Sequence, residues 1–157
     1  TIYPALTSAE EILGDNPDGI MLSNGPGDPK ECTSIIKEIK KLYDSDVPIF
    51  AICLGHQLMA LATGGDTHKM KYGHRGGNHP VKDLETGRVY ISSQNHGYVV
   101  DAEGLEEKKH RTSCICKTSM TEQTRVWHIM ERTSLLCSSI RKHARDRRIP
   151  VTCLTDS

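Results

Sequence analysis

The chain has 157 residues, its 20 Lys or Arg balance its 20 Asp or Glu, and only 4% of its residues are aromatic. This length suffices for one domain with a hydrophobic core. We find no run apolar enough to span a membrane and no signal-peptide pattern in these residues. The first residue is Thr1, and we expect the chain to be a fragment.

Strands and helices are predicted to alternate along the first sixty residues. Helical patterns cover residues 7–13, 31–42 and 57–62, and short apolar strands cover 18–23 and 47–52. Alternation at this spacing favours an α/β fold, with a parallel sheet covered on both faces. From residue 67 to residue 100 the pattern changes to short strands and turns, of which 89–93 is the clearest strand.

The second strand leads directly to Cys53. Gly55 follows two residues later, and the helical pattern begins at Gln57. A thiol on a tight turn between a strand and a helix lies near the positive end of the helix dipole, so we expect a lowered pKa and a favoured thiolate. This is the cysteine version of the nucleophile elbow. The alternative for so short a motif is a buried cysteine that ends a core strand.

Two polar segments accompany the elbow. Residues 22–29, Leu-Ser-Asn-Gly-Pro-Gly-Asp-Pro, follow a strand, and residues 93–98 read Ser-Gln-Asn-His-Gly-Tyr. In an open α/β sheet the loops at the carboxyl ends of the strands gather at one crevice. A glycine-rich loop there can offer backbone N–H groups to an oxyanion, and the N–H of Leu54 is the second expected donor. A glycine-rich loop alone is more often a turn, but together the three motifs predict a nucleophilic site.

The last third of the chain differs from the rest. Residues 1–104 carry nine Lys or Arg and fourteen Asp or Glu, whereas residues 105–157 carry eleven and six, together with four of the six cysteines. No set of Cys and His has metal-ligand spacing, and free thiols favour a reducing cytoplasm. The basic run at 141–148 reads as a solvated tail, because nucleic-acid binding rests there on charge alone. We expect residues 105–157 to be poorly ordered.

These motifs resemble the class I glutamine amidotransferase domain and, within it, the small, glutamine-hydrolysing subunit of carbamoyl phosphate synthetase. Residues 22–29 and 53–57, Cys-Leu-Gly-His-Gln, mark the class. Residues 69–81 and 93–98 mark the carbamoyl phosphate branch against its anthranilate and GMP synthetase relatives. The resemblance covers residues 1 to about 101. It implies a flavodoxin-like open sheet that is incomplete at both ends, with residues 1–104 as a partial amidotransferase domain.

The resemblance also implies roles by position. Cys53 would attack the glutamine side-chain amide, form a thioester and release ammonia, and the N–H groups of Gly25 and Leu54 would bind the oxyanion. The glutamine would be held by Gly25, Gly27, Leu54, Gln57, Asn95, Gly97 and Tyr98. The implied partner is an ATP-using large subunit, with no cofactor or metal in this domain and no nucleic-acid or membrane partner. Whether the product feeds pyrimidine or arginine synthesis stays open.

Three residues near these motifs need a separate interpretation. His56 and His96 are not the triad base of the family, and we read them as structural histidines bonded to loop backbone. Ala51 stands where the family usually has Gly, so it adds a methyl group close to the elbow.

The base that a nucleophilic cysteine requires is missing. The family supplies it from a His-Pro-Glu segment, yet the chain contains no His-x-Glu at all. Residues 137–149 are, however, compatible with Val-Gln-Phe-His-Pro-Glu-Ala-Cys-Pro-Gly-Pro-Gln-Asp when their codons are read one base earlier. Residues 120–123 and 152–157 shift in the same way to further family segments. We therefore hypothesise a one-base frameshift between about residue 104 and residue 113.

Three expectations complete this interpretation. The chain as written should have little glutaminase activity, and its exposed sheet edges should make it marginally stable or prone to aggregate. A non-catalytic module that only docks on a large subunit is one alternative. An amidotransferase subunit of another pathway is the second.

Overall fold

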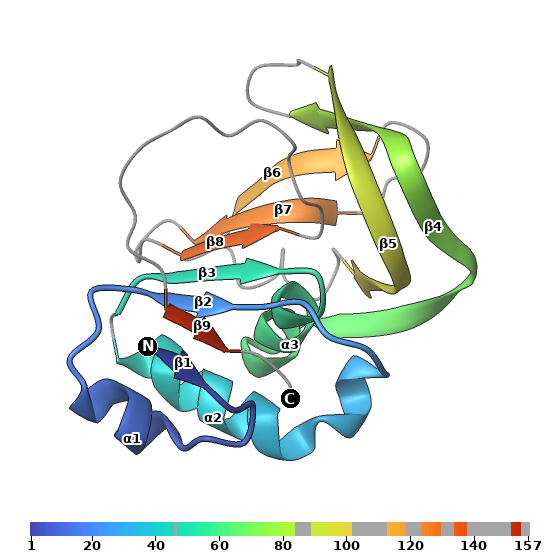
Figure 1. Ribbon diagram of the computed structural model, residues 1–157. Coiled ribbons are helices and arrows are strands. Elements are labelled where there is room, and N and C mark those ends of the chain that lie inside the picture. The colour runs from blue at the N-terminus through green and yellow to red at the C-terminus, as the bar shows by residue number, and fades with distance from the viewer. Residues whose placement is uncertain are drawn as a thin grey trace.

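The computed structural model describes residues 1–45, 47–83, 89–101, 113–118, 124–129, 134–137 and 152–154, with side chains described in 1–45, 47–80, 89, 91 and 94–101. In chain order its elements are β1 (Ile2–Tyr3), α1 (Ala9–Gly14), β2 (Ile20–Leu22), the 3-10 helix η1 (Pro29–Glu31), α2 (Thr33–Asp44), β3 (Ile49–Ile52), α3 (Leu54–Ala62), β4 (Asp66–Asp83), β5 (Val89–Asp101), β6 (Ser113–Thr118), β7 (Thr124–Ile129), β8 (Ser134–Cys137) and β9 (Thr152–Leu154) (Figure 1).

The nine strands in the described residues belong to one sheet, in the order β1-β9-β2-β3-β8-β7-β6-β4-β5. The part from β1 to β8 is parallel, with Ile20 opposite Ile49 and Leu22 opposite Ala51 in the β2–β3 pair. From β8 onward every pair is antiparallel. The expected α/β open sheet is therefore confirmed in its parallel part. In the described residues no helix is long and apolar enough to cross a membrane.

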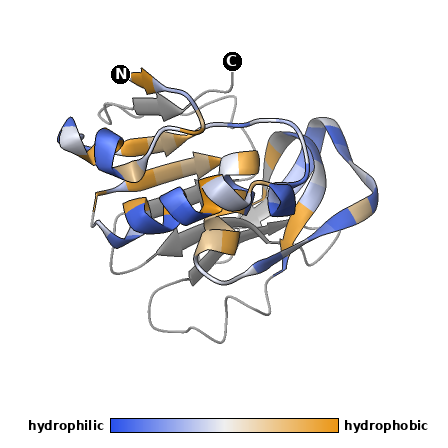
Figure 2. Cartoon of the chain, turned by 90° about the horizontal axis from the view of Figure 1, so that it is seen from below, coloured by the Kyte–Doolittle hydropathy of each residue, from blue (hydrophilic) through white to orange (hydrophobic). Residues whose placement is uncertain are grey.

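The described α-helices lie on one face of the sheet, which differs from the expected cover on both faces (Figures 1 and 2). The connections β1–α1–β2 and β2–α2–β3 both advance in the same direction along the strand order. A right-handed crossover places its helix on a face that depends on this direction. Two crossovers in the same direction therefore place both helices on the same face.

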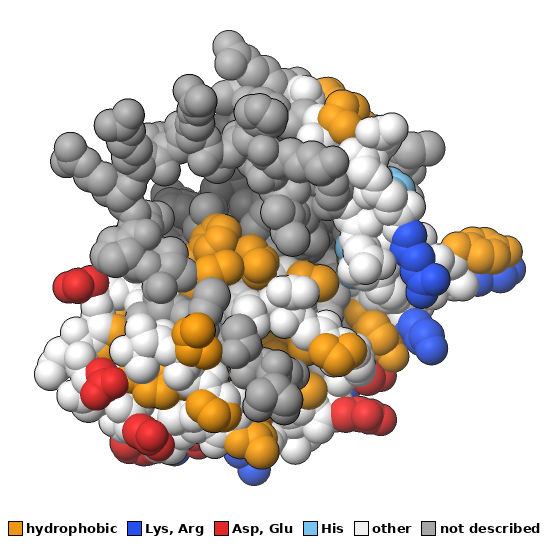
Figure 3. Space-filling model, in the orientation of Figure 1, with side chains coloured by type: hydrophobic (Ala, Val, Ile, Leu, Met, Phe, Trp, Pro, Cys, Tyr) orange, Lys and Arg blue, Asp and Glu red, His pale blue; other side chains and the backbone are white. Residues whose placement is uncertain are grey.

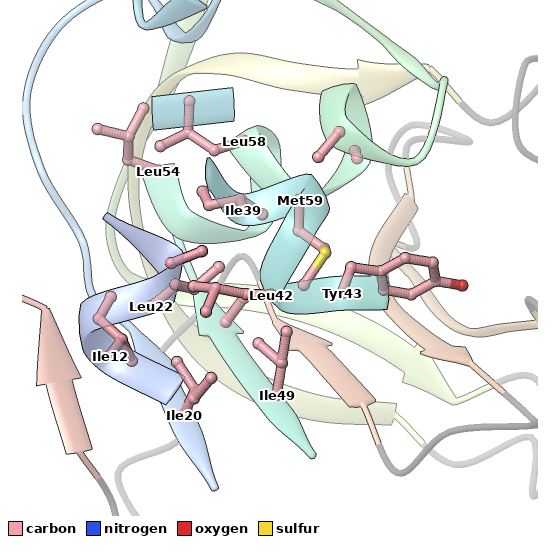
Figure 4. Packing of buried hydrophobic residues seen from close by; sticks show 14 of the residues in the cluster. Ile12, Ile20, Leu22, Ile39, Leu42, Tyr43, Ile49, Leu54, Leu58 and Met59 are labelled. Atoms are coloured by element: carbon pink, nitrogen blue, oxygen red, sulfur yellow. The ribbon is translucent and has the colours of Figure 1, made fainter. Parts of the chain in front are cut away.

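The predicted cap at the start of α1 is present, and the helices pack on the sheet through their apolar residues. Ser8 caps α1, because its hydroxyl accepts a hydrogen bond from Glu11 N–H at 3.3 Å, and two acidic residues follow in the first turn. The α2 helix turns Ile39, Leu42 and Tyr43 toward the sheet. A cluster of buried hydrophobic side chains fills the space between the helices and the sheet. It includes Ile12, Ile20, Leu22, Ile49, Leu58 and Met59 (Figure 4).

The methyl group of Ala51 fits into this core. Ala51 is 0% exposed on β3 and belongs to the buried cluster. The extra carbon relative to glycine is thus in a packed apolar environment, where burial is favourable.

Residues 66–83 and 89–101 form two long strands, β4 and β5, instead of several short strands and turns. Two register shifts interrupt the β4–β5 ladder, one between Lys69 and His74 and the other between Gly76 and His79. Gly73 and Gly76 have φ values of +66° and +137°. The glycines that suggested turns therefore mark bulges inside a continuous strand, which is a common use of glycine in sheets.

Four of the strands, β6 to β9, fall within residues 105–157, where the sequence predicts little regular structure. β9 pairs with both β1 and β2, and β8 pairs with β3. Strand pairing needs only an extended backbone with available N–H and C=O groups, and the edges of β2 and β3 offer both. β9 and β8 thus cover the outer sides of β2 and β3, while β1 and β5 are the edge strands of the described sheet. The frameshift itself stays a prediction.

Candidate active site

Cys53 joins β3 directly to α3 in a strained backbone conformation. Its φ and ψ are +50° and −112°, and among the described residues other than glycine only Asn16 also has a positive φ. The helix begins at once, at Leu54, and Gln57 N–H donates to the Cys53 carbonyl at 3.2 Å. Strain of this kind persists where the surrounding structure imposes it, and functional sites are common places for it. The expected sharp strand-to-helix elbow is present.

Gly55 allows the elbow to lie directly against the end of β2. A Cβ atom at Gly55 would be 2.6 Å from the carbonyl oxygen of Leu22 and 2.7 Å from its Cβ. The Gly55 N–H donates to the Ser23 carbonyl at 3.1 Å. Only glycine fits so close an approach of helix and strand. The glycine-rich loop and the cysteine turn are thereby held side by side.

The expected lowering of the Cys53 pKa is wrong in direction. Burial raises the pKa of the thiol, and the hydrogen bond from Leu54 N–H opposes this increase without cancelling it. A thiolate is costly where water is excluded and no cation compensates it. With the surroundings that the described residues provide, the thiol is therefore neutral at pH 7, and its activation requires a base.

Residues of β5 form the opposite wall of the site. The Cys53 thiol donates to the Asn95 carbonyl at 3.9 Å, and the Gln57 side-chain amide donates to the Tyr98 carbonyl at 2.8 Å. Four of the residues implied by the resemblance are therefore brought together: Cys53 from the turn before α3, Gln57 from α3, and Asn95 and Tyr98 from β5.

The glycine-rich loop forms the third side. Gly27 has a φ of +104°, and Asp28 accepts a hydrogen bond from Lys30 N–H at 2.9 Å, which starts η1. The Tyr98 hydroxyl also donates to Asp28, and this bond raises the pKa of Tyr98. Asp28 thus fastens the loop to β5, a role that the sequence motif alone did not reveal. Gly25 lies in the same loop, half-buried.

Two features border this loop on its outer side. Lys30 pairs with Asp66 of β4 at 2.7 Å, and both side chains are at least half exposed. A small cavity of about 70 Å³ lies behind the loop, lined in part by Asn24, Cys32 and Leu58. Ligand pockets usually measure about 300 Å³ or more, so this cavity is a packing gap.

The two histidines near the motifs are buried. His56 is 1% exposed on α3. His96 is 6% exposed, with Nδ1 2.9 Å from the Tyr98 carbonyl and Nε2 3.4 Å from the side-chain oxygen of Gln94. The environment of His96 agrees with a structural histidine bonded to backbone.

The base and its carboxylate partner are not found in the described residues. There, the hydrogen bonds of the Cys53 sulfur are those with Asn95 and Leu54, and the same residues contain no cluster of three His, Cys, Asp or Glu that could hold a metal. The neighbouring strand β8 ends at Cys137, which lies opposite Ile52. The segment read as His-Pro-Glu in the shifted frame begins after this strand and lies outside the described residues.

Comparison with known proteins matches residues 1–138 to the family described as "Glutamine amidotransferase class-I". The "Carbamoyl phosphate synthase small chain" of Neisseria meningitidis serogroup B is 60% identical over 105 residues, which are 67% of this chain and 28% of that protein. The small chain of Escherichia coli K12 is 62% identical over 101 residues, 64% of this chain and 26% of that protein. The chain thus spans little more than a quarter of the length of these relatives.

Solved structures show the same fold at low identity. A putative GMP synthase protein from Thermoplasma acidophilum superposes with a TM-score of 0.73 at 20% identity, over 88% of this chain and 69% of that chain. A glutamine amidotransferase from Thermotoga maritima gives a TM-score of 0.63 at 15% identity, over 78% of this chain and 55% of that one.

Proposed function

We propose, because this chain belongs to the class I glutamine amidotransferase family, that the crevice around Cys53 is a glutamine-hydrolysing site. The observation that carries the proposal is the Cys53 elbow, with its positive φ, between the end of a buried parallel strand and the first turn of α3. Such a turn exposes a nucleophile beside backbone N–H groups.

The proposed reaction is an acyl transfer in two steps. The Cys53 sulfur attacks the amide carbon of the glutamine side chain and gives up its thiol proton, the C–N bond breaks, and the leaving nitrogen takes up that proton and departs as ammonia. Water then attacks the thioester carbon, the C–S bond breaks, and glutamate and the free thiol are released. The N–H groups of Leu54 and Gly25 are the proposed donors to the oxyanion in both steps.

The substrate side chain is proposed to lie between the glycine-rich loop and β5. The hydrogen bonds between Cys53 and Asn95 and between Gln57 and Tyr98 support this placement, because they draw the two walls together. Polar groups that face each other across a narrow site can hold a glutamine amide at the sulfur. Gly27 and Gly97 complete the proposed substrate contacts.

We further propose that the ammonia serves carbamoyl phosphate synthesis on an ATP-using large subunit. The identities of about 60% to carbamoyl phosphate synthase small chains support this branch of the family. The protein as a whole is proposed to act in the cytoplasm. We propose no cofactor for this domain.

The activity of the chain as written is proposed to be low. The half-buried thiol is neutral in its ground state, and the sequence contains no His-x-Glu segment. Loss of a catalytic base typically lowers rates by a factor of about 10² to 10⁴. The position of β8 supports the frameshift hypothesis, because a His-Pro-Glu segment read after Cys137 would follow the strand adjacent to Cys53.

The test compares two versions of the gene. Ammonia release from glutamine is measured for this chain and for a chain whose frame is restored by one inserted base between codons 104 and 113. We expect a gain of at least about 10²-fold in the restored chain, abolished by Cys53→Ser. A restored frame without His-Pro-Glu refutes the frameshift. A normal rate in the chain as written, lost in Cys53→Ser, refutes the impairment.

The missing base also favours a second candidate, a docking module without turnover. Its signature is stable co-purification with a large subunit while Cys53 is intact and no ammonia is released. If both versions bind the large subunit but only the restored chain releases ammonia, the restored chain is the glutaminase and the chain as written is the docking module.

A further inference from the structure

The β4 strand bulges outward beside the site. Lys69 pairs with Tyr98 and His74 pairs with His96, so four residues, Met70–Gly73, stand opposite the single residue Gly97. We call this segment the β4 bulge. A Cβ atom on Gly73 would be 2.9 Å from the His96 carbonyl, and its φ is +66°. Glycine therefore anchors the base of the bulge against β5, and the other residues are displaced outward.

An aromatic side chain lies at the tip of this bulge. Tyr72 is 83% exposed, the largest exposed fraction among the described large hydrophobic residues. The Lys71 ammonium lies 5.3 Å from the centre of its ring, which is within the range of a cation–π contact. A shallow recess of about 280 Å³ follows the bulge from His68 to His74. The feature thus combines a projecting ring and a hollow.

The surroundings of Tyr72 are cationic. Lys69, Lys71 and Arg75 are exposed, and none of them forms an ion pair with a carboxylate in the described residues. The acidic Asp101 pairs instead with His68, at 2.6 Å. In the space-filling view, Lys or Arg side chains and a protruding hydrophobic side chain gather at the right-hand edge, over the β4–β5 region (Figure 3). This local charge contrasts with the net charge of zero of the whole chain.

We propose that the β4 bulge is a docking surface for an acidic face of the ammonia-consuming partner subunit. The inference rests on the proposed function, which requires such a partner. Exposed aromatic residues flanked by cations are typical anchors of protein interfaces, because the ring enters a pocket while the charges meet opposite charges. Nucleic acid is the less favoured occupant, since the patch offers a single exposed aromatic ring and its cations are few.

The place of the bulge strengthens this choice of partner. Gly73 contacts His96 and Gly97, and the neighbouring residues Asn95 and Tyr98 contact Cys53 and Gln57. A protein bound at the bulge therefore rests on the strand that forms one wall of the glutamine crevice. Ammonia released from the thiol is then freed close to its consumer.

The test measures binding of this chain to an immobilised large subunit of Escherichia coli carbamoyl phosphate synthase. Tyr72→Ala and Lys71→Glu are expected to weaken Kd by at least about tenfold each. Lys37→Glu, an exposed cation on α2, is the matched control and should change Kd less than about twofold. The wild-type Kd should weaken as salt rises, and Lys71→Glu should reduce that dependence.

The outcomes separate the docking surface from the proposed chemistry. Unchanged Kd values in both bulge variants overturn the docking surface and leave the partner in place. No binding by wild type overturns both the partner and the surface, whereas ammonia release measured on the restored chain alone still tests the chemistry. Binding of a single-stranded RNA oligonucleotide that Tyr72→Ala abolishes, without subunit binding, reassigns the surface to nucleic acid. Circular dichroism of each variant confirms that the fold is intact.

Discussion

Replacing Gly55 by Ala should loosen the junction of α3 with β2. The new Cβ would be 2.6, 2.7 and 2.8 Å from three Leu22 atoms, the carbonyl oxygen, Cβ and carbonyl carbon. Ordinary contacts begin near 3.4 Å, so the helix must move by about 0.8 Å at the closest contact. Two of these atoms belong to the backbone of a buried strand and cannot rotate away.

Two opposing terms set the size of this effect. Overpacking a well-packed site costs about 1–3 kcal/mol, whereas Ala is favoured over Gly in a helix by about 0.5–1 kcal/mol. We expect a net loss of about 1–2 kcal/mol, which corresponds to a roughly 5- to 30-fold larger equilibrium constant for local opening. The shift also lengthens the Gly55 N–H bond to the Ser23 carbonyl, now 3.1 Å, and moves Cys53 from its place beside the loop.

Hydrogen exchange of the α3 amides, followed by mass spectrometry, measures this opening without a global unfolding transition. Gly14→Ala is the matched control, because Gly14 ends α1 and a Cβ added there would have no atom within 4 Å. We expect exchange in that variant to be unchanged or slower, by at most about 1 kcal/mol of stabilisation. Equal or slower α3 exchange in Gly55→Ala would refute the steric reasoning.

Titration and charge removal test the electrostatics of the site. Burial raises the pKa of Cys53, so iodoacetamide should modify the Cys53 peptide with a pH midpoint above the ordinary thiol value of about 8.5; a lower midpoint contradicts this. Because the folded pKa is the higher one, this thiol stabilises the fold below its unfolded pKa, and the contribution disappears as pH rises through the folded value. The hydrogen bond to Asp28 raises the pKa of Tyr98, so Tyr98→Phe should remove a tyrosinate absorbance step that lies above about pH 10; loss of a step at lower pH argues against the bond. The same sign applies, and the stabilisation by Tyr98 is lost at high pH. Lys30→Ala should leave hydrogen exchange in η1 and β4 nearly unchanged, because the side chains of the Lys30–Asp66 pair are 50% and 61% exposed and water screens their attraction; clearly faster exchange in both elements would show that the pair holds them together.

Local patterns predicted the elements that surround the nucleophile. The apolar runs of β2 and β3, the Ser8 cap and the periodicity of α2 are properties of neighbouring residues, and the structure contains each element within a few residues of its predicted place. The elbow at Cys53 was predictable for the same reason, because strand, turn and helix follow one another in the chain.

Features that depend on distant segments were not predictable in this way. The sign of the Cys53 pKa depends on how much of the thiol is buried, and the bond between Asp28 and Tyr98 joins residues seventy positions apart. Glycines in β4 look like turn residues until the pairing with β5 shows them to be bulges. Residues 134–137 and 152–154 show no periodic pattern of apolar side chains that would predict a strand. They pair through backbone N–H and C=O groups, which every sequence has.

The position of β9 affects when the sheet can form. β9, at residues 152–154, lies between β1 and β2, and among the described strands it is the sole partner of β1. The first described strand therefore depends on the last one, although all of the other described elements lie between them in the chain. Contacts between such distant segments slow folding, because the chain loses loop entropy before the pairing compensates for it. This edge of the sheet should form late, and a chain that lacks residues 152–154 would leave β1 without its described partner.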